Sequence, residues 1–76
     1  MNSYFHSTMD KPAVLHYLDS EFDVIEPGKY VVCAVTEAQI LLEDLKYWSV
    51  SRQEPYADAK AATTAYAKAQ ENGEEF

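Results

Sequence analysis

The chain has 76 residues, a single cysteine and a formal net charge of −7, from 13 acidic and 6 basic side chains. This length allows one domain, one cysteine excludes an internal disulfide, and the few Cys and His residues cannot supply a four-ligand zinc site. Because the basic residues are scattered and nucleic acids bind basic patches, the composition also argues against a nucleic-acid partner.

Residues 1–12 are expected to be a flexible lead-in. They lack the basic and apolar regions of a secretory signal, and no stretch of the chain approaches the ~20 apolar residues that span a bilayer. Tyr4 and Phe5 could dock on the domain or on a partner, or belong to a disordered terminus. We therefore expect a cytoplasmic protein with no membrane partner, in which Cys33 is a reduced thiol.

Residues 14–18 and 21–25 are two short runs of β-forming side chains that flank Asp19-Ser20. A two-residue loop between such runs predicts a β-hairpin. The resulting register pairs Tyr17 with Phe22, Leu15 with Val24, His16 with Asp23 and Leu18 with Glu21. One face of this hairpin is wholly apolar, and the other is polar near its middle.

Residues 26–29 have the sequence Glu-Pro-Gly-Lys, which predicts a type II turn because Pro27 fixes φ and Gly28 supplies a positive φ. A tight turn adds a third strand and gives one apolar face, made of Leu15, Tyr17, Phe22, Val24, Val31, Cys33 and Val35. The opposite face is only half apolar and carries Val14, His16, Asp23, Ile25, Tyr30, Val32 and Ala34. The C-terminal part or a second copy must cover it. A looser loop would shift this register, since type II turns fit hairpin twist poorly.

Residues 36–50 fit two structures. Thr36 and Gln39 have the spacing of a capping box, and large apolar residues follow at helical intervals, so one interpretation is an amphipathic helix. The other places a loop after Thr36, returns Ile40 to the apolar face beside Cys33, and extends residues 46–50. Propensity alone slightly favours the helix.

A resemblance bears on this choice. Between residues 15 and 56 the chain carries the motifs L-H-Y-L-D, E-P-G, C-A-V-T, L-K-Y-W-S-V and R-Q-E-P-Y. With these it resembles a small family of uncharacterised proteins, a domain of unknown function found in alphaproteobacteria. That family's pattern has Gly where this chain has Glu37, and prolines near Gln39 and Leu41 that would not suit a helix interior. The resemblance implies the extended interpretation and a bacterial cytosolic setting, and it implies no activity.

The last third of the chain predicts a helix. Residues 51–56 are expected to form at most one helical turn because Pro55 cannot donate a helical hydrogen bond. Asp58 can cap a helix of good helix formers, and Asn72-Gly73 is a stop signal. The expected apolar stripe comprises Ala59, Ala62, Tyr66 and Ala69. Residues 73–76 are expected to be a frayed tail.

Cys33 and His16 are the candidate catalytic side chains. A nucleophilic thiol needs exposure and a nearby base, whereas the registers place Cys33 on the apolar face and His16 on the opposite one. His16 opposite Asp23 either orients an imidazole for acid–base work or is a structural cross-strand pair. A metal site at His16, Asp19 and Asp23 lacks a recognisable spacing. We therefore predict no catalytic residue, no metal site and no cofactor.

The candidate protein-interaction site is a cluster of aromatic residues and an arginine, namely Tyr47, Trp48, Arg52 and Tyr56. These residue types are enriched at interface hot spots, and they lie where the predicted sheet gives way to the helix. Trp48 could instead fill the small core. A buried tyrosine hydroxyl would need a hydrogen-bond partner.

Together these patterns predict an α+β domain over residues 13–72, with a small antiparallel β-meander followed by a C-terminal α-helix. The predicted function is a non-enzymatic cytoplasmic interaction module that binds itself, as a possible homodimer, or another protein. It would bind through the half-covered face and the surroundings of Trp48. The alternative is a small-molecule or metal-binding accessory domain. An enzyme ranks third, because no nucleophile, base and orienting group converge.

Overall fold

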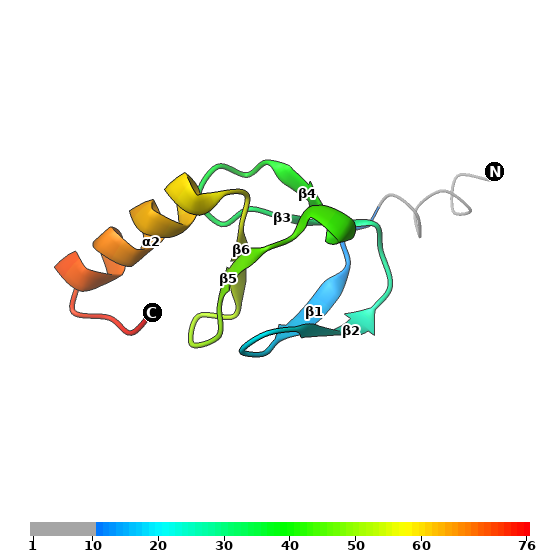
Figure 1. The fold of residues 1–76 in the computed structure, drawn as a ribbon, viewed down its shortest axis with the longest axis horizontal. Helices are drawn as coiled ribbons and strands as arrows, with labels where there is room; N and C mark the ends of the chain where they lie inside the picture. The colour runs from blue at the N-terminus through cyan, green and yellow to red at the C-terminus, as the bar shows by residue number, and fades with distance from the viewer. Residues whose placement is uncertain (1–10) are drawn as a thin grey trace.

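The computed structural model describes residues 11–76, so the expectations for residues 1–10, including a docking role for Tyr4 and Phe5, lie outside the described residues. The described chain forms three antiparallel hairpins followed by one helix, which confirms the predicted α+β class (Figure 1). The elements are β1 (Val14–Tyr17), β2 (Phe22–Glu26), β3 (Tyr30–Val32), β4 (Gln39–Leu41), the 3-10 turn η1 (Leu42–Asp44), β5 (Tyr47–Ser49), β6 (Glu54–Tyr56) and α2 (Ala59–Glu71).

The first hairpin has the predicted register. β1 and β2 place Tyr17 opposite Phe22, His16 opposite Asp23 and Leu15 opposite Val24. The Leu18 amide donates to the Glu21 carbonyl at 2.8 Å and closes the two-residue loop. The register shifts between Val14 and Leu15, so that Val14 lies opposite Glu26 at the open end of the hairpin.

The expected third strand, which a tight turn at residues 26–29 would pair with residues 21–25, is wrong, and Val31 does not lie opposite Val24. β3 pairs with β4 instead, and Val31 lies opposite Ile40. Gly28 is not needed for a positive φ. It is needed for a close approach, because a Cβ at this position would lie 2.7 Å from the Cα of Ala13. Ala13 donates its amide to the Tyr30 carbonyl at 2.7 Å, so the chain segment after Gly28 is held by the entry to β1 rather than by β2.

Residues 36–50 are extended apart from the single 3-10 turn, so the extended interpretation is correct and the helical one is wrong. A turn after Cys33 reverses the chain, with the Cys33 amide donating to the Ala38 carbonyl at 2.9 Å. Glu37 adopts a φ of 67° in this turn, a conformation that glycine occupies more readily.

Residues 51–56 were expected to form at most one helical turn, and they form no helix. Residues 54–56 are instead the strand β6, which the sequence did not predict. β6 pairs with β5, and Pro55 lies opposite Trp48. Pro55 has no amide to offer a strand ladder, but its carbonyl accepts a hydrogen bond from the Ala34 amide at 3.0 Å. This bond connects the third hairpin to the end of the second.

The helix α2 has the predicted ends. The Asp58 carboxylate accepts from the Ala61 amide at 2.8 Å, and Gly73 has a φ of 68°. The amides of Gly73 and Glu74 donate to the carbonyls of Gln70 and Ala69, which is the Schellman motif. The predicted stripe is partly wrong. Ala59 and Tyr66 are exposed, and the buried face comprises Ala61, Ala62, Ala65 and Ala69.

Residues 73–76, expected to be frayed, pack on the domain instead. The ring of Phe76 stacks on Tyr56 with centroids 5.7 Å apart and meets the edge of Tyr66 at 5.3 Å. The backbone oxygen of Phe76 accepts a hydrogen bond from the Ser49 hydroxyl at 2.5 Å. The chain after α2 therefore covers the third hairpin.

The core lies where the three hairpins and the helix meet. Its buried apolar residues are Ala13, Tyr17, Val31, Cys33, Ile40, Leu45, Tyr56 and Ala61. The first hairpin is connected to the third by side chains. The Gln53 side-chain amide accepts from the Tyr17 amide at 2.9 Å and donates to the Tyr17 carbonyl at 2.8 Å, as a neighbouring strand would.

Candidate protein-interaction surface

The four residues of the predicted interaction cluster all lie on the third hairpin or its loop, but they do not share one surface. In the β5–β6 ladder Tyr47 lies directly opposite Tyr56. Tyr47 is 41% exposed, whereas Tyr56 is 1% exposed. Tyr56 is buried and Trp48 is half-buried, whereas Tyr47 and Arg52 are exposed, so the four side chains do not present one common surface.

Trp48 is a half-buried connector between the first and third hairpins. Its ring lies 5.9 Å from that of Tyr17 and meets the edge of Phe22 at 5.7 Å. Its indole Nε1 donates to the Leu18 carbonyl at 2.6 Å. Trp48 therefore packs within the domain, which agrees with the alternative prediction that it fills the core.

Tyr56 is one of the most deeply buried side chains. Its hydroxyl donates to a carboxylate oxygen of Glu54 at 2.8 Å, which supplies the partner that a buried tyrosine needs. Burial raises the pKa of Tyr56, and the adjacent Glu54 carboxylate raises it further. Tyr56 is thus a neutral core residue and is not available to a partner.

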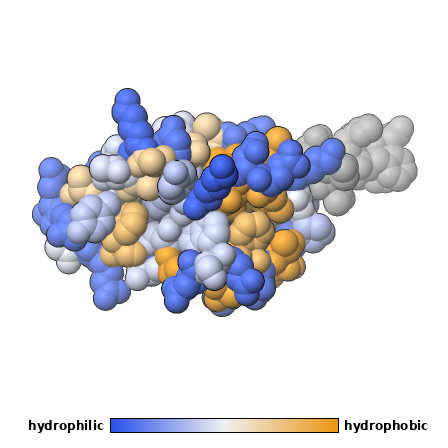
Figure 2. All heavy atoms as spheres, viewed as in Figure 1, coloured by the Kyte–Doolittle hydropathy of each residue, from blue (hydrophilic) through white to orange (hydrophobic). Residues whose placement is uncertain are grey.

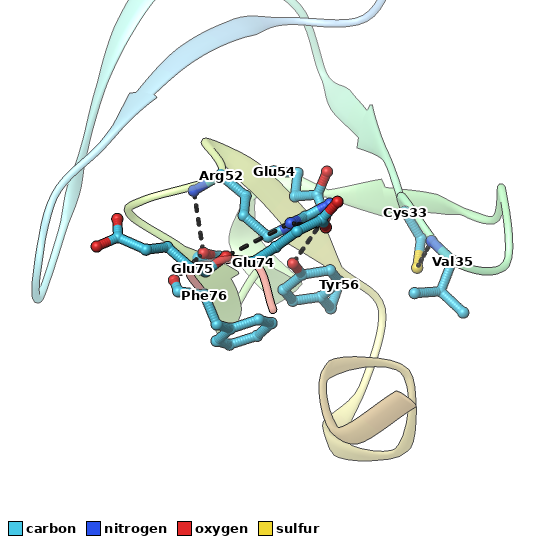
Figure 3. Close-up of polar contacts among 9 residues, drawn as sticks. Cys33, Val35, Arg52, Glu54, Tyr56, Glu74, Glu75 and Phe76 are labelled. Atoms are coloured by element: carbon cyan, nitrogen blue, oxygen red, sulfur yellow. Dashed lines mark hydrogen bonds and ion pairs between the residues drawn. The ribbon is translucent and has the colours of Figure 1, made fainter. Parts of the chain in front are cut away.

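Arg52 is exposed, but its guanidinium is already engaged within the chain. It forms ion pairs with Glu54 at 3.2 Å and with Glu74 at 3.0 Å, and it donates to the Glu75 carbonyl. Figure 3 shows this network beside Tyr56 and Phe76. Arg52 holds the chain after α2 against the third hairpin. Of the predicted cluster, Tyr47 is the member whose exposed side chain makes no hydrogen bond or ion pair to the described residues.

Cys33 is buried, as predicted, but its surroundings are polar. The amides of Val35, Thr36 and Ala57 approach its sulfur at 3.4, 3.4 and 3.2 Å. Burial by itself raises the pKa of the Cys33 thiol, but the hydrogen bonds from Thr36, Val35 and Ala57 favour the thiolate and lower the pKa overall.

Alkylation of Cys33 is expected to depend on unfolding. The sulfur is enclosed, with the residue 1% exposed, so iodoacetamide should react slowly at neutral pH and rapidly in denaturant. The rate is measured by mass spectrometry across a urea series, with a free thiol compound as the reference. Fast labelling of the native protein would contradict the burial of this thiol and revive a thiol chemistry.

His16 and Asp23 face each other across the first hairpin, as predicted, and both are exposed. Within residues 11–76, no group of three or more His, Cys, Asp or Glu side chains is arranged to hold a metal ion. No helix in this same part of the chain is long and apolar enough to cross a membrane.

The surface that remains apolar lies at the open end of the first hairpin. Val14, Val24 and Ile25 are 46%, 51% and 60% exposed. Val14 and Ile25 belong to the face that was expected to need a cover, and α2 packs on the third hairpin instead. Val24, which the sequence placed on the covered face, is exposed because β3 does not extend that sheet. Figure 2 shows apolar side chains gathered over the hairpin side of the molecule.

A family model described as an uncharacterized protein conserved in bacteria (DUF2093) matches residues 24–65, more than half of the chain. The chain belongs to this family. The match runs from β2 into α2, so the DUF2093 region includes the second and third hairpins and one strand of the first. No curated protein and no solved structure matches the chain.

Proposed function

We propose that this DUF2093 protein is a non-enzymatic interaction domain that binds a protein, either a second copy of itself or another cytoplasmic protein. The observation that supports this is the open end of the first hairpin, where Val14 and Ile25 on one face and Val24 on the other are exposed. Exposed apolar side chains gathered at one place are typical of interaction sites. Val14, Val24 and Ile25 are called the open-end patch below.

We further propose a cytoplasmic setting in an alphaproteobacterium. The resemblance carried by the C-A-V-T and Y-W-S-V motifs supports the source, and the free thiol of Cys33 fits a reducing compartment. The burial of Cys33, which keeps its thiol from acting as an exposed nucleophile, supports a binding role.

Self-association is tested by sedimentation velocity with Ile25→Ser. If two copies meet at the open-end patch, the wild-type sedimentation coefficient rises with concentration. Ile25→Ser should then weaken association about tenfold or more, because burying one isoleucine contributes about 1.5–3 kcal/mol. Val50→Ser is the matched control, since Val50 is also exposed but lies in the loop of the third hairpin.

If the protein stays a strict monomer at high concentration, self-association is excluded, and another cytoplasmic protein remains as the proposed partner. That class is tested by affinity capture from the native cytosol with the same two variants. If Ile25→Ser and Val50→Ser reduce the captured partner by the same amount, or if neither reduces it, the partner does not bind through the open-end patch.

A further inference from the structure

β2 has one edge that is paired with β1 and one that no described strand or loop occupies (Figure 1). The predicted third strand would have filled that second edge, but β3 pairs with β4. An unpaired edge presents amide and carbonyl groups that can template a further strand.

The register identifies which groups face outward. Leu18 and Glu21 form the hydrogen-bonded pair next to the loop, and pairs alternate along an antiparallel ladder. Tyr17 and Phe22 are therefore a non-hydrogen-bonded pair, and the bonds from Tyr17 to the Gln53 side chain, on the far side of β1, agree with this. On β2, the amides and carbonyls of Phe22 and Val24 point away from β1.

The side chains along this edge separate by face. Phe22 and Val24 lie on one face of the hairpin, and Glu21 and Asp23 lie on the other. Strands that pair side by side bring residues of the same face into contact. A strand that fits this edge would carry apolar side chains on one face and basic side chains on the other.

A second copy of β2 fits this edge poorly. Only Phe22 and Val24 offer outward backbone groups, so they must pair with each other or with themselves in an antiparallel dimer. The register that sets Phe22 opposite Val24 places Asp23 opposite Asp23, and the one that sets Phe22 opposite itself places Glu21 opposite Asp23. The register that sets Val24 opposite itself places Phe22 opposite Glu26. Like charges directly opposite destabilise a sheet, and each copy carries a net charge of −7. Acidic residues at an edge protect against self-addition while leaving the edge open to a basic strand.

We propose that the outer edge of β2 binds an extended segment of another protein in which apolar residues alternate with Lys or Arg, added as a third strand of the first hairpin. This inference rests on the proposed interaction function and specifies its partner. The added strand would make backbone hydrogen bonds to Phe22 and Val24 and place its basic side chains beside Glu21 and Asp23.

The test uses a blocked seven-residue peptide that alternates Val and Lys, with two control peptides in which Ser replaces Val or Glu replaces Lys. Affinity is measured by fluorescence anisotropy at several salt concentrations. The Val/Lys peptide should bind about tenfold or more tightly than either control. Only this peptide offers apolar side chains to the face of Phe22 and Val24 and basic side chains to the face of Glu21 and Asp23.

Two pairs of variants separate the backbone contacts from the charges. Val24→Pro removes an outward amide and should weaken binding about tenfold, whereas Val24→Thr keeps the amide and the branched shape and should stay within about threefold. Asp23→Asn should weaken binding and reduce its salt dependence, whereas Asp44→Asn, at an exposed acid in η1, should not. Circular dichroism checks that each variant is folded.

Amide hydrogen exchange on the wild-type protein gives a readout that needs no variant. The peptide should slow exchange at Phe22 and Val24 and leave Leu15, whose amide faces the opposite edge of the hairpin, unchanged. Binding without protection at Phe22 and Val24 would overturn the edge proposal and indicate general charge attraction. If the Val/Lys peptide does not bind at all, the edge proposal is also overturned. The proposed interaction function is tested separately, by the effect of Ile25→Ser on association and capture.

Discussion

Tyr56→Ala is expected to unfold most of the protein. Tyr56 is almost fully buried, where it stacks on Phe76 and lies in the core cluster. Removing a buried aromatic side chain costs about 3–5 kcal/mol, and a core of this size rarely supplies more than roughly 3–5 kcal/mol in total. Urea denaturation followed by circular dichroism and by the fluorescence of Trp48 measures the change.

Tyr47→Ala is the matched control, because the two tyrosines lie opposite each other in the same ladder. Tyr47 is largely exposed, so its loss should cost about 1 kcal/mol or less. Tyr56→Phe isolates the hydroxyl and should cost about 0.5–1.5 kcal/mol through the lost hydrogen bond to Glu54. Equal losses for Tyr47→Ala and Tyr56→Ala would contradict the inward orientation of Tyr56.

Trp48→Ala is expected to cost about 3 kcal/mol, at the lower end of the range for a large aromatic residue because Trp48 is only half-buried. The substitution removes both ring contacts with the first hairpin and the indole hydrogen bond to Leu18. Trp48→Phe keeps most of the ring packing and should lose about 1 kcal/mol with that bond. Since Trp48 is the only tryptophan, stability is followed by circular dichroism.

A Trp48→Ala variant that is as stable as the wild type but fails to capture a partner would contradict this account and return Trp48 to an interface. The structure makes Tyr47→Ala the better probe of binding near the third hairpin. Its side chain is exposed beside Trp48, so its loss removes surface without removing the core.

The first hairpin and the helix could be predicted because their signals are local. A two-residue loop fixes the β1–β2 register from Tyr17 to Leu15, and the apolar alternation agrees with it. Asp58 and Gly73 define the ends of α2 by hydrogen bonds that their own side chain and backbone make. Such features need no knowledge of the rest of the chain.

The second and third hairpins depended on contacts that the local sequence does not show. The Pro27-Gly28 turn was assigned to a hairpin, but Gly28 is used to let the chain pass close to Ala13. Pro55 argued against a helix but gave no sign of a strand, and in β6 it lies opposite Trp48 while its carbonyl accepts from the Ala34 amide. The buried face of α2 was predicted incorrectly, because which of its alanines are buried depends on where the third hairpin packs against the helix.

The candidate site was predicted by residue type and corrected by burial. Trp48 and Tyr56 are hot-spot residue types, but large rings also fill cores, and here Tyr56 belongs to the core and Trp48 packs against it. The open-end patch was partly foreseen, since Val14 and Ile25 were expected on a face lacking its own cover. Gln53 was missed, because a glutamine side chain that replaces a strand leaves no pattern in the sequence.

The connection between the first and third hairpins has a consequence for how the fold opens. No strand ladder crosses this boundary, so the first hairpin can detach as a cooperative unit with its own turn and register intact. Trp48 and Gln53, which lie away from β2, contribute to the equilibrium constant for that sub-global opening, together with the buried ring of Tyr17. Changes at positions 48 and 53 can therefore tune how often the hairpin separates, while the edge that it presents keeps its chemistry.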